Sequence, residues 1–160
     1  MCMISSLPLS KAFVKAAESL GFAHQGSLGP TKGEAYRDND RVSVNDPVLA
    51  NTIWVSGLNK LFSDFKIRGK VAVGLNPNIR FYWLVGYKVG QHFGWHIDES
   101  VDLGDGKHTN YTLLIYLSGG MAFNDGMALL LIHGDKCMLH EARNVSKGVK
   151  YVLRSDVTFA

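Results

Sequence analysis

The middle of the chain carries the segment Gln91-His92-Phe93-Gly94-Trp95-His96-Ile97-Asp98, in which a histidine and an aspartate stand two residues apart. Its aromatic residues favour a β-strand, and on a strand this spacing sends the side chains of His96 and Asp98 to the same face. An imidazole and a carboxylate that project together supply two of the three ligands of a non-haem Fe(II) site. The segment therefore predicts a metal-binding strand, provided that a second histidine reaches it from elsewhere.

The third ligand must come from the other histidines of the chain, which are His24, His92, His108, His133 and His140. His24 and His108 lie in polar segments that are typical of a protein surface. His92 stands four residues before His96, a spacing that suits a helical zinc pair rather than a strand. His133 and His140 both follow an apolar run at 127–132. His140 is the preferred ligand, and it precedes Lys150 by ten residues.

Length and composition indicate one globular domain over residues 1–160. Hydrophobic residues make up 46% of the chain and charged residues 19%, which argues against disorder. The net charge of +3 comes from basic residues spread along the sequence without a basic block. A nucleic-acid partner is therefore disfavoured.

The two cysteines, Cys2 and Cys137, form neither a disulfide framework nor a CxxC zinc site. We find no signal peptide in residues 1–10 and no apolar run long enough to span a membrane. The expectation is a soluble protein of a reducing compartment, the cytoplasm or the nucleus, with no membrane partner. The oligomeric state cannot be read from the sequence.

The first 68 residues are expected to be mainly helical support and loop. Ser10 is the predicted cap of a helix that ends at Gly21, and Asp46 followed by Pro47 predicts the start of a second helix, weakened at Gly57. Between the helices, the polar residues 25–41 predict a long loop that could act as a lid over a site.

Residues 69–160 have the character of a β core that contains the site. Six segments rich in β-branched and aromatic residues predict strands at 71–74, 79–88, 92–98, 111–118, 127–133 and 150–159. The predicted fold class is α+β, a double-stranded β-helix (jelly roll) with N-terminal flanking helices. The polar insertion 99–110 is predicted to be a loop at the mouth between the sheets.

Iron bound by two histidines and one carboxylate most commonly works with 2-oxoglutarate, whose far carboxylate needs a buried cation and a hydroxyl. Alternation along the last strand places Lys150, Val152 and Arg154 on one face. On the strand 111–118, the residues that share one face are Thr112, Leu114 and Tyr116. These two faces together predict a pocket for a short dicarboxylate.

Taken in order along the chain, a set of motifs resembles a known family. The set is Tyr87-x-x-Gly90-x-x-Phe93-x-x-His96-x-Asp98, then Tyr111-Thr112-Leu113-Leu114-Ile115-Tyr116-Leu117, then Gly126-Met127-Ala128-Leu129-Leu130, then His140-Glu141, then Gly148-Val149-Lys150-Tyr151-Val152-Leu153-Arg154-Ser155-Asp156-Val157. In order and spacing it resembles the Fe(II)/2-oxoglutarate dioxygenases of the prolyl-4-hydroxylase-like superfamily. The resemblance covers residues 79–159, about half of the chain.

This resemblance implies a role for each matching residue. His96, Asp98 and His140 fall where the family binds iron, and they are the predicted catalytic and metal-binding residues. The remaining matches are predicted to bind the co-substrate: Lys150 as its cation, Tyr116 and Tyr87 as accompanying hydroxyls, and Arg154 at either end. The implied cofactors are Fe(II), 2-oxoglutarate and O2, with ascorbate as a further candidate.

The implied reaction is hydroxylation of a C–H bond in a peptidyl side chain or a small molecule, with decarboxylation of 2-oxoglutarate to succinate. The chain departs from the family at residues 118–125, which are short and lack the usual Glu-Thr, so the mouth is expected to be more open there. An alternative function is therefore a metal- or dicarboxylate-binding module of the same fold without turnover. A zinc hydrolase is disfavoured, because no carboxylate is evidently placed as a general base.

Overall fold

The computed structural model describes residues 7–26, 38–85, 93–118, 126–142 and 148–160. Within these ranges the protein is mostly β-sheet, with few helices. Its helices are α1 (Leu7–Leu20), α2 (Pro47–Ile53) and α3 (Asn59–Leu61), with a π-helical segment, Trp54–Leu58, between the last two. Its strands are β1 (Ala23–Gly26), β2 (Asp38–Asn45), β3 (Lys66–Ile67), β4 (Lys70–Leu75), β5 (Asn78–Val85), β6 (Phe93–His96), β7 (Asp102–Gly104), β8 (Lys107–Tyr116), β9 (Ala128–Ile132), β10 (His140–Ala142) and β11 (Val149–Phe159).

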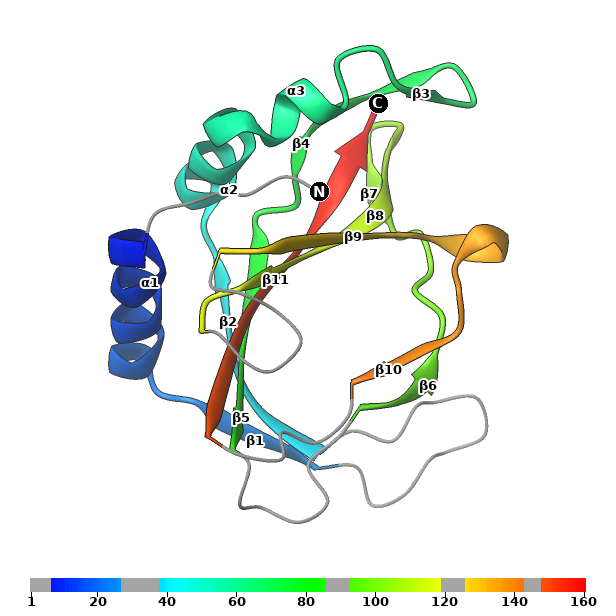
Figure 1. Ribbon diagram of the computed structural model, residues 1–160. Coiled ribbons are helices and arrows are strands. Elements are labelled where there is room, and N and C mark those ends of the chain that lie inside the picture. The colour runs from blue at the N-terminus through cyan, green and yellow to red at the C-terminus, as the bar shows by residue number, and fades with distance from the viewer. Residues whose placement is uncertain (1–6, 27–37, 86–92, 119–125, 143–147) are drawn as a thin grey trace.

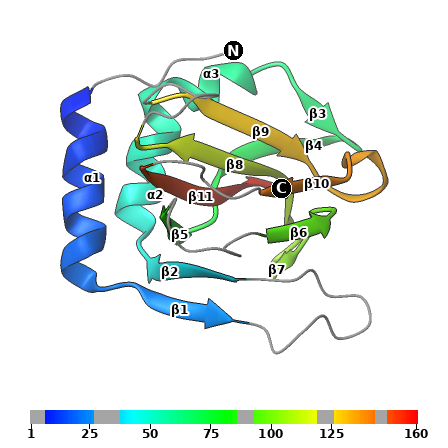
Figure 2. The ribbon, with the colours of Figure 1, turned by 60° about the horizontal axis from the view of Figure 1, so that its bottom comes forward.

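Strand β11 lies inside a large antiparallel sheet that curls around one side of the molecule (Figure 1). One edge of β11 pairs with β5 and then with β4, and its other edge pairs with β8. Strands β2 and β1 extend the sheet beyond β5, while β9 and β7 both pair with β8. Strands β6 and β10 form a separate two-stranded sheet. Figures 1 and 2 show the helices on one side of the large sheet and the β6–β10 pair on the other.

The alternation of side chains along the strands divides the large sheet into a core face and an open face. On β11, Leu153 and Val157 are fully buried in a cluster that includes Ile53 and Leu58 from the helical segment. Leu113 on β8 and Ile79 on β5 join the same cluster. The intervening positions point away from the helices, toward the β6–β10 sheet. The predicted separation of faces along β11 and β8 is confirmed.

Local signals predicted the helix ends with mixed success. Asp46 caps α2 as expected, since its Oδ1 accepts a hydrogen bond of 2.9 Å from the Leu49 N–H. Gly57 interrupts the helical segment with a φ of +134°, which only glycine adopts readily. The prediction that Ser10 caps α1 is wrong, because the helix begins at Leu7. Proline is tolerated in the first turn of a helix, so Pro8 does not delay the start.

Two predicted loops contain strands. Residues 25–41 include the end of β1 and the beginning of β2, and the part at 27–37, where the lid was predicted, lies outside the described residues. The insertion 99–110 is a hairpin of β7 and the start of β8, with left-handed backbone at residues 104–106. At the hairpin tip the Lys70 ammonium group on β4 donates to the Gly106 carbonyl. The insertion is therefore a paired hairpin rather than the predicted loop, and none of its residues lines the cavity described below.

Residues 1–68 thus supply strands of the large sheet as well as helices. Strand β2 was not predicted, because its sequence, Asp38-Asn-Asp-Arg-Val-Ser-Val-Asn45, is polar and lacks a hydrophobic run. None of the described helices is long and apolar enough to cross a membrane.

Candidate metal centre

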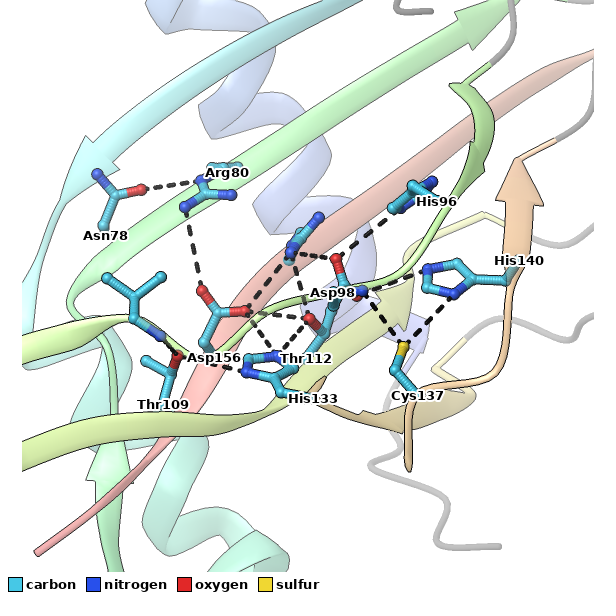
Figure 3. A network of polar contacts seen from close by, with 12 residues as sticks. Asn78, Arg80, His96, Asp98, Thr109, Thr112, His133, Cys137, His140 and Asp156 are labelled. Atoms are coloured by element: carbon cyan, nitrogen blue, oxygen red, sulfur yellow. Dashed lines mark hydrogen bonds and ion pairs between the residues drawn. The ribbon is translucent and has the colours of Figure 1, made fainter. Parts of the chain in front are cut away.

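His96, Asp98 and His140 converge at one point of the small sheet, as predicted (Figure 3). His96 ends β6 and His140 begins β10, and the two residues are register partners across this strand pair. Asp98 Oδ1 lies 3.8 Å from His96 Nε2, and Asp98 Oδ2 lies 3.5 Å from His140 Nε2. One potential ligand atom from each residue lies within 4.8 Å of the other two. Two atoms bound to one ion at about 2.1 Å are at most about 4.2 Å apart, so this cluster is close to a metal-binding arrangement.

Backbone carbonyls fix the orientation of both imidazoles. His96 Nδ1 lies 2.8 Å from the Gly94 carbonyl oxygen, and His140 Nδ1 lies 2.8 Å from the Met138 carbonyl oxygen. Because a carbonyl only accepts, each Nδ1 must carry the proton, which leaves the lone pair on Nε2. Both Nε2 atoms face Asp98. In this tautomer and orientation, the two imidazoles can bind one metal ion through Nε2.

Among the described residues, one carboxylate oxygen of Asp98 is hydrogen-bonded, and the other is not. Arg154 Nη2 donates to Asp98 Oδ1 at 2.9 Å and to Thr112 Oγ1 at 3.2 Å. In contrast, Oδ2 is buried and makes no hydrogen bond within the part of the chain that the structure describes. A buried carboxylate oxygen without a donor is costly, and a cation would satisfy it. The donor set of two imidazoles and one carboxylate therefore fits a divalent transition metal.

A short turn after β9 fixes the backbone of Asp98. The Gly134 N–H donates to the Asp98 carbonyl at 2.9 Å, and the Asp98 N–H donates to Cys137 Sγ at 3.2 Å. Cys137 is half-buried, and its sulfur also lies 3.9 Å from His140 Nδ1. Cys137 thus contacts both Asp98 and His140, and nothing in the sequence pattern predicted this supporting role.

Burial and the local charges keep His96 and Asp98 in the protonation states that bind metal. Burial lowers the pKa of His96, and the neighbouring His140 lowers it further. Burial alone would raise the pKa of Asp98, but the Arg154 guanidinium, the Thr112 hydroxyl and the two imidazoles together hold it below its usual value. A neutral His96 and an ionised Asp98 are therefore the forms present near neutral pH.

Metal-free protein should become less stable as the pH falls below 6.5. Burial also lowers the pKa of His133, so the folded forms of His96 and His133 take up protons less readily than an exposed imidazole of pKa 6.5. Protons then bind the unfolded chain first, and stability that is complete above pH 6.5 is lost as the pH falls through the folded pKa values. Urea unfolding midpoints at pH 7.5, 6.5 and 5.5 test this. A midpoint that rises on acidification would contradict it.

A cavity of about 630 Å³ adjoins the three residues of the His–Asp–His cluster, between the open face of the large sheet and the β6–β10 pair. Its lining includes the predicted co-substrate residues Lys150, Arg154 and Tyr116, together with Thr112 and Leu114. Lys150 Nζ lies 4.9 Å from the centroid of the Tyr116 ring, and burial lowers its pKa. Tyr87, the remaining predicted residue, lies outside the described residues.

His133 and two tryptophans, Trp83 and Trp95, do not belong to the His–Asp–His cluster. His133 is buried, and its Nε2 lies 2.9 Å from Thr112 Oγ1, so it belongs to the hydrogen-bond network beneath Asp98 rather than to the ligand set. Trp95 is 57% exposed at the cavity rim, whereas Trp83 packs against Phe22 with 5.8 Å between ring centroids.

Four polar residues of the cavity wall escaped sequence analysis, namely Asn39, Arg41, Arg80 and Tyr82. They lie on β2 and β5. Alternation within β5 already places Arg80 and Tyr82 on one face. The missing information was which face of β5 continues the face of β11 that carries Lys150 and Arg154, and this depends on long-range strand pairing.

The chain is similar to known proteins in its structure and not in its sequence. No protein-family model matches the chain, and no curated protein sequence matches it. Among solved structures, the viral collagen prolyl hydroxylase vCPH from Paramecium Bursaria Chlorella virus-1, in its 2OG complex, matches with a TM-score of 0.65 and 15% identity over 100% of this chain and 94% of the other. A Pseudomonas putida prolyl-4-hydroxylase matches with a TM-score of 0.57 and 11% identity over 98% and 90%.

The chain has a prolyl-hydroxylase-like fold. The similarity covers nearly the full length of both structures, so it concerns the whole arrangement of strands rather than one motif. At this level of identity the comparison establishes the fold alone, and the chemistry must be argued from the residues of the site.

Proposed function

We propose that this protein is an Fe(II)- and 2-oxoglutarate-dependent dioxygenase that hydroxylates a C–H bond. The observation that carries the proposal is the convergence of His96, Asp98 and His140 beside a cavity lined by the half-buried Lys150. The double-stranded β-helix is the corresponding proposal for the fold, supported by the curled antiparallel sheet and the neighbours of the same shape.

The proposed reaction balances as follows. Bound Fe(II) would supply the oxidising chemistry by which one oxygen atom of O2 enters the substrate C–H bond as a hydroxyl group, while the other enters 2-oxoglutarate as it loses CO2 and becomes succinate. The substrate and the co-substrate each give up two electrons. The protein's share is to hold three ligands on one side of the ion and to keep the cavity partly dry.

Lys150 is the better of the two candidate cations for the far carboxylate of 2-oxoglutarate. Arg154 is already engaged with Asp98, at 2.9 Å, and lies 3.8 Å from Asp156. Lys150 stands four residues earlier on the same face of β11, beside the hydroxyl-bearing Tyr116. Both residues line the same cavity as the His–Asp–His cluster, where an ammonium group and a phenol would suit the far carboxylate of a short dicarboxylate.

The proposal is tested by adding Fe(II) and 2-oxoglutarate without oxygen and recording the visible absorption spectrum. We expect the weak band that arises when 2-oxoglutarate chelates iron, and succinate formation once O2 is admitted. Absence of both the band and succinate would refute the proposal. The band without any succinate, across a panel of substrates, would instead support the binding module without turnover.

A further inference from the structure

The cavity contains more positive charge than the proposed reaction uses. Its lining includes four cationic side chains, which are Arg41, Arg80, Lys150 and Arg154, and two carboxylates, Asp98 and Glu141. Arg154 is paired with Asp98, and Lys150 is assigned above to 2-oxoglutarate. The two arginines on β2 and β5 therefore have no part in holding the metal or the co-substrate.

These two arginines are neighbours on one wall. Strand register places Arg41 opposite Tyr82 and Ser43 opposite Arg80. Arg41 and Arg80 are therefore diagonal neighbours on adjacent strands, with Cβ atoms about 7–8 Å apart. Long side chains at this spacing can bring two guanidinium groups onto one anion.

Neither arginine is fully neutralised by the protein. Arg41 is half-buried and makes no ion pair with any residue that the structure describes. Arg80 Nε donates to Asn78 Oδ1 at 3.1 Å, and its Nη2 lies 4.0 Å from Asp156 Oδ2, a carboxylate that Arg154 also approaches (Figure 3). A partly dehydrated guanidinium favours a carboxylate or phosphate, which it binds with two parallel hydrogen bonds.

An unsatisfied amide lies beside the arginines. Asn39 stands two residues before Arg41 on β2, lines the cavity and is only 6% exposed. Its Oδ1 makes no hydrogen bond to the described part of the chain. Because a buried carbonyl oxygen without a donor is costly, Asn39 Oδ1 indicates a ligand group that donates a hydrogen bond, such as a hydroxyl or amino group.

We propose that the molecule oxidised at this site is a small organic anion. Its carboxylate or phosphate binds Arg41 and Arg80, and its adjacent hydroxyl or amino group donates to Asn39. The inference rests on the proposed function for the oxidation itself, but the anion site depends only on the β2–β5 wall. It disfavours a neutral peptide, which would leave Arg41 without an anionic partner among the described residues and Arg80 with only the 4.0 Å approach of Asp156.

The anion site is tested with inorganic phosphate as the probe, on protein loaded with Mn(II) and saturated with 2-oxoglutarate. Binding near the metal should enhance the ³¹P relaxation of phosphate. We expect Arg41→Gln to reduce this enhancement at least fivefold and Arg41→Gln/Arg80→Gln to remove it, while Arg68→Gln, on an exposed turn outside the cavity, leaves it unchanged. Equal enhancement in all variants, or none in the wild type, would overturn the proposal. Water-proton relaxation reports separately whether Mn(II) is bound, and without bound Mn(II) the ³¹P linewidth serves as the readout.

A second experiment separates carboxylate from phosphate and anion from neutral molecule. Hydroxy acids, amino acids and small phosphate monoesters are compared with their neutral esters as stimulants of succinate formation. We expect one anionic class to exceed its neutral counterpart at least tenfold, with KM for that substrate at least tenfold higher in Arg41→Gln and KM for 2-oxoglutarate changed less than twofold. Neutral esters or a proline-rich peptide that stimulate as strongly as the acids would contradict the inference.

Discussion

Replacement of His140 by alanine should reduce the affinity for Fe(II) or Mn(II) more than about a hundredfold. Loss of a residue that only supports a metal ligand costs 10–100-fold, and loss of a ligand should cost more. His140 Nε2 is 3.5 Å from Asp98 Oδ2, the buried oxygen that makes no hydrogen bond in the described structure. Metal titration followed by competition with a chelator measures the change.

His133→Ala is the matched control. His133 is also buried near Asp98, but its Nε2 contacts Thr112. Its removal should lower the free energy of unfolding by about 1–3 kcal/mol, the usual effect of leaving a buried partner unsatisfied, and change metal affinity only a few-fold. The reverse pattern, with metal binding lost in His133→Ala and retained in His140→Ala, would show that the wrong histidine had been assigned.

Replacement of Lys150 by alanine should raise KM for 2-oxoglutarate by about thirtyfold or more. Truncating one partner of a buried charge pair costs about 2–5 kcal/mol, and 2 kcal/mol corresponds to roughly thirtyfold. Metal affinity should be unchanged, because Lys150 is not among the residues of the His–Asp–His cluster. Steady-state succinate formation at varied 2-oxoglutarate concentration gives KM and kcat separately.

Two further variants define the Lys150 effect. Lys136→Ala removes an exposed lysine outside the cavity and should leave both constants unchanged. Lys150→Arg keeps the charge and should recover part of the affinity. If Lys150→Ala has a normal KM while Arg154→Gln does not, the far carboxylate binds Arg154 and the assignment of the two cations must be exchanged.

Short-range spacing predicted the parts of the site that depend on a single strand. The two-residue separation of His96 and Asp98 and the alternation from Lys150 to Arg154 follow from strand geometry alone. His140 was predicted as the third ligand from its position in an ordered set of motifs. The structure places it opposite His96. The roles assigned to Lys150, Arg154 and Tyr116 stay predictions until the co-substrate is bound.

Features that depend on pairing between distant segments could not be predicted. Arg80 and Arg154 share a cavity because they are register partners across β5 and β11. The contact of Arg154 with Asp98 joins residues 56 positions apart. Strand β2 was missed since its polar residues line a cavity instead of a core, so its composition matched that of a loop.

The position of β11 has a consequence for how the protein is made. This strand follows all the others in the sequence, yet it pairs with β4, β5 and β8. While a ribosome is still short of residue 149, the edges of these strands that later meet β11 have no partner, and Asp98 has no guanidinium beside it. Such long-range pairing forms late and slowly. An unfinished chain is therefore expected to bind a divalent metal ion at the His–Asp–His cluster more weakly than the finished chain does.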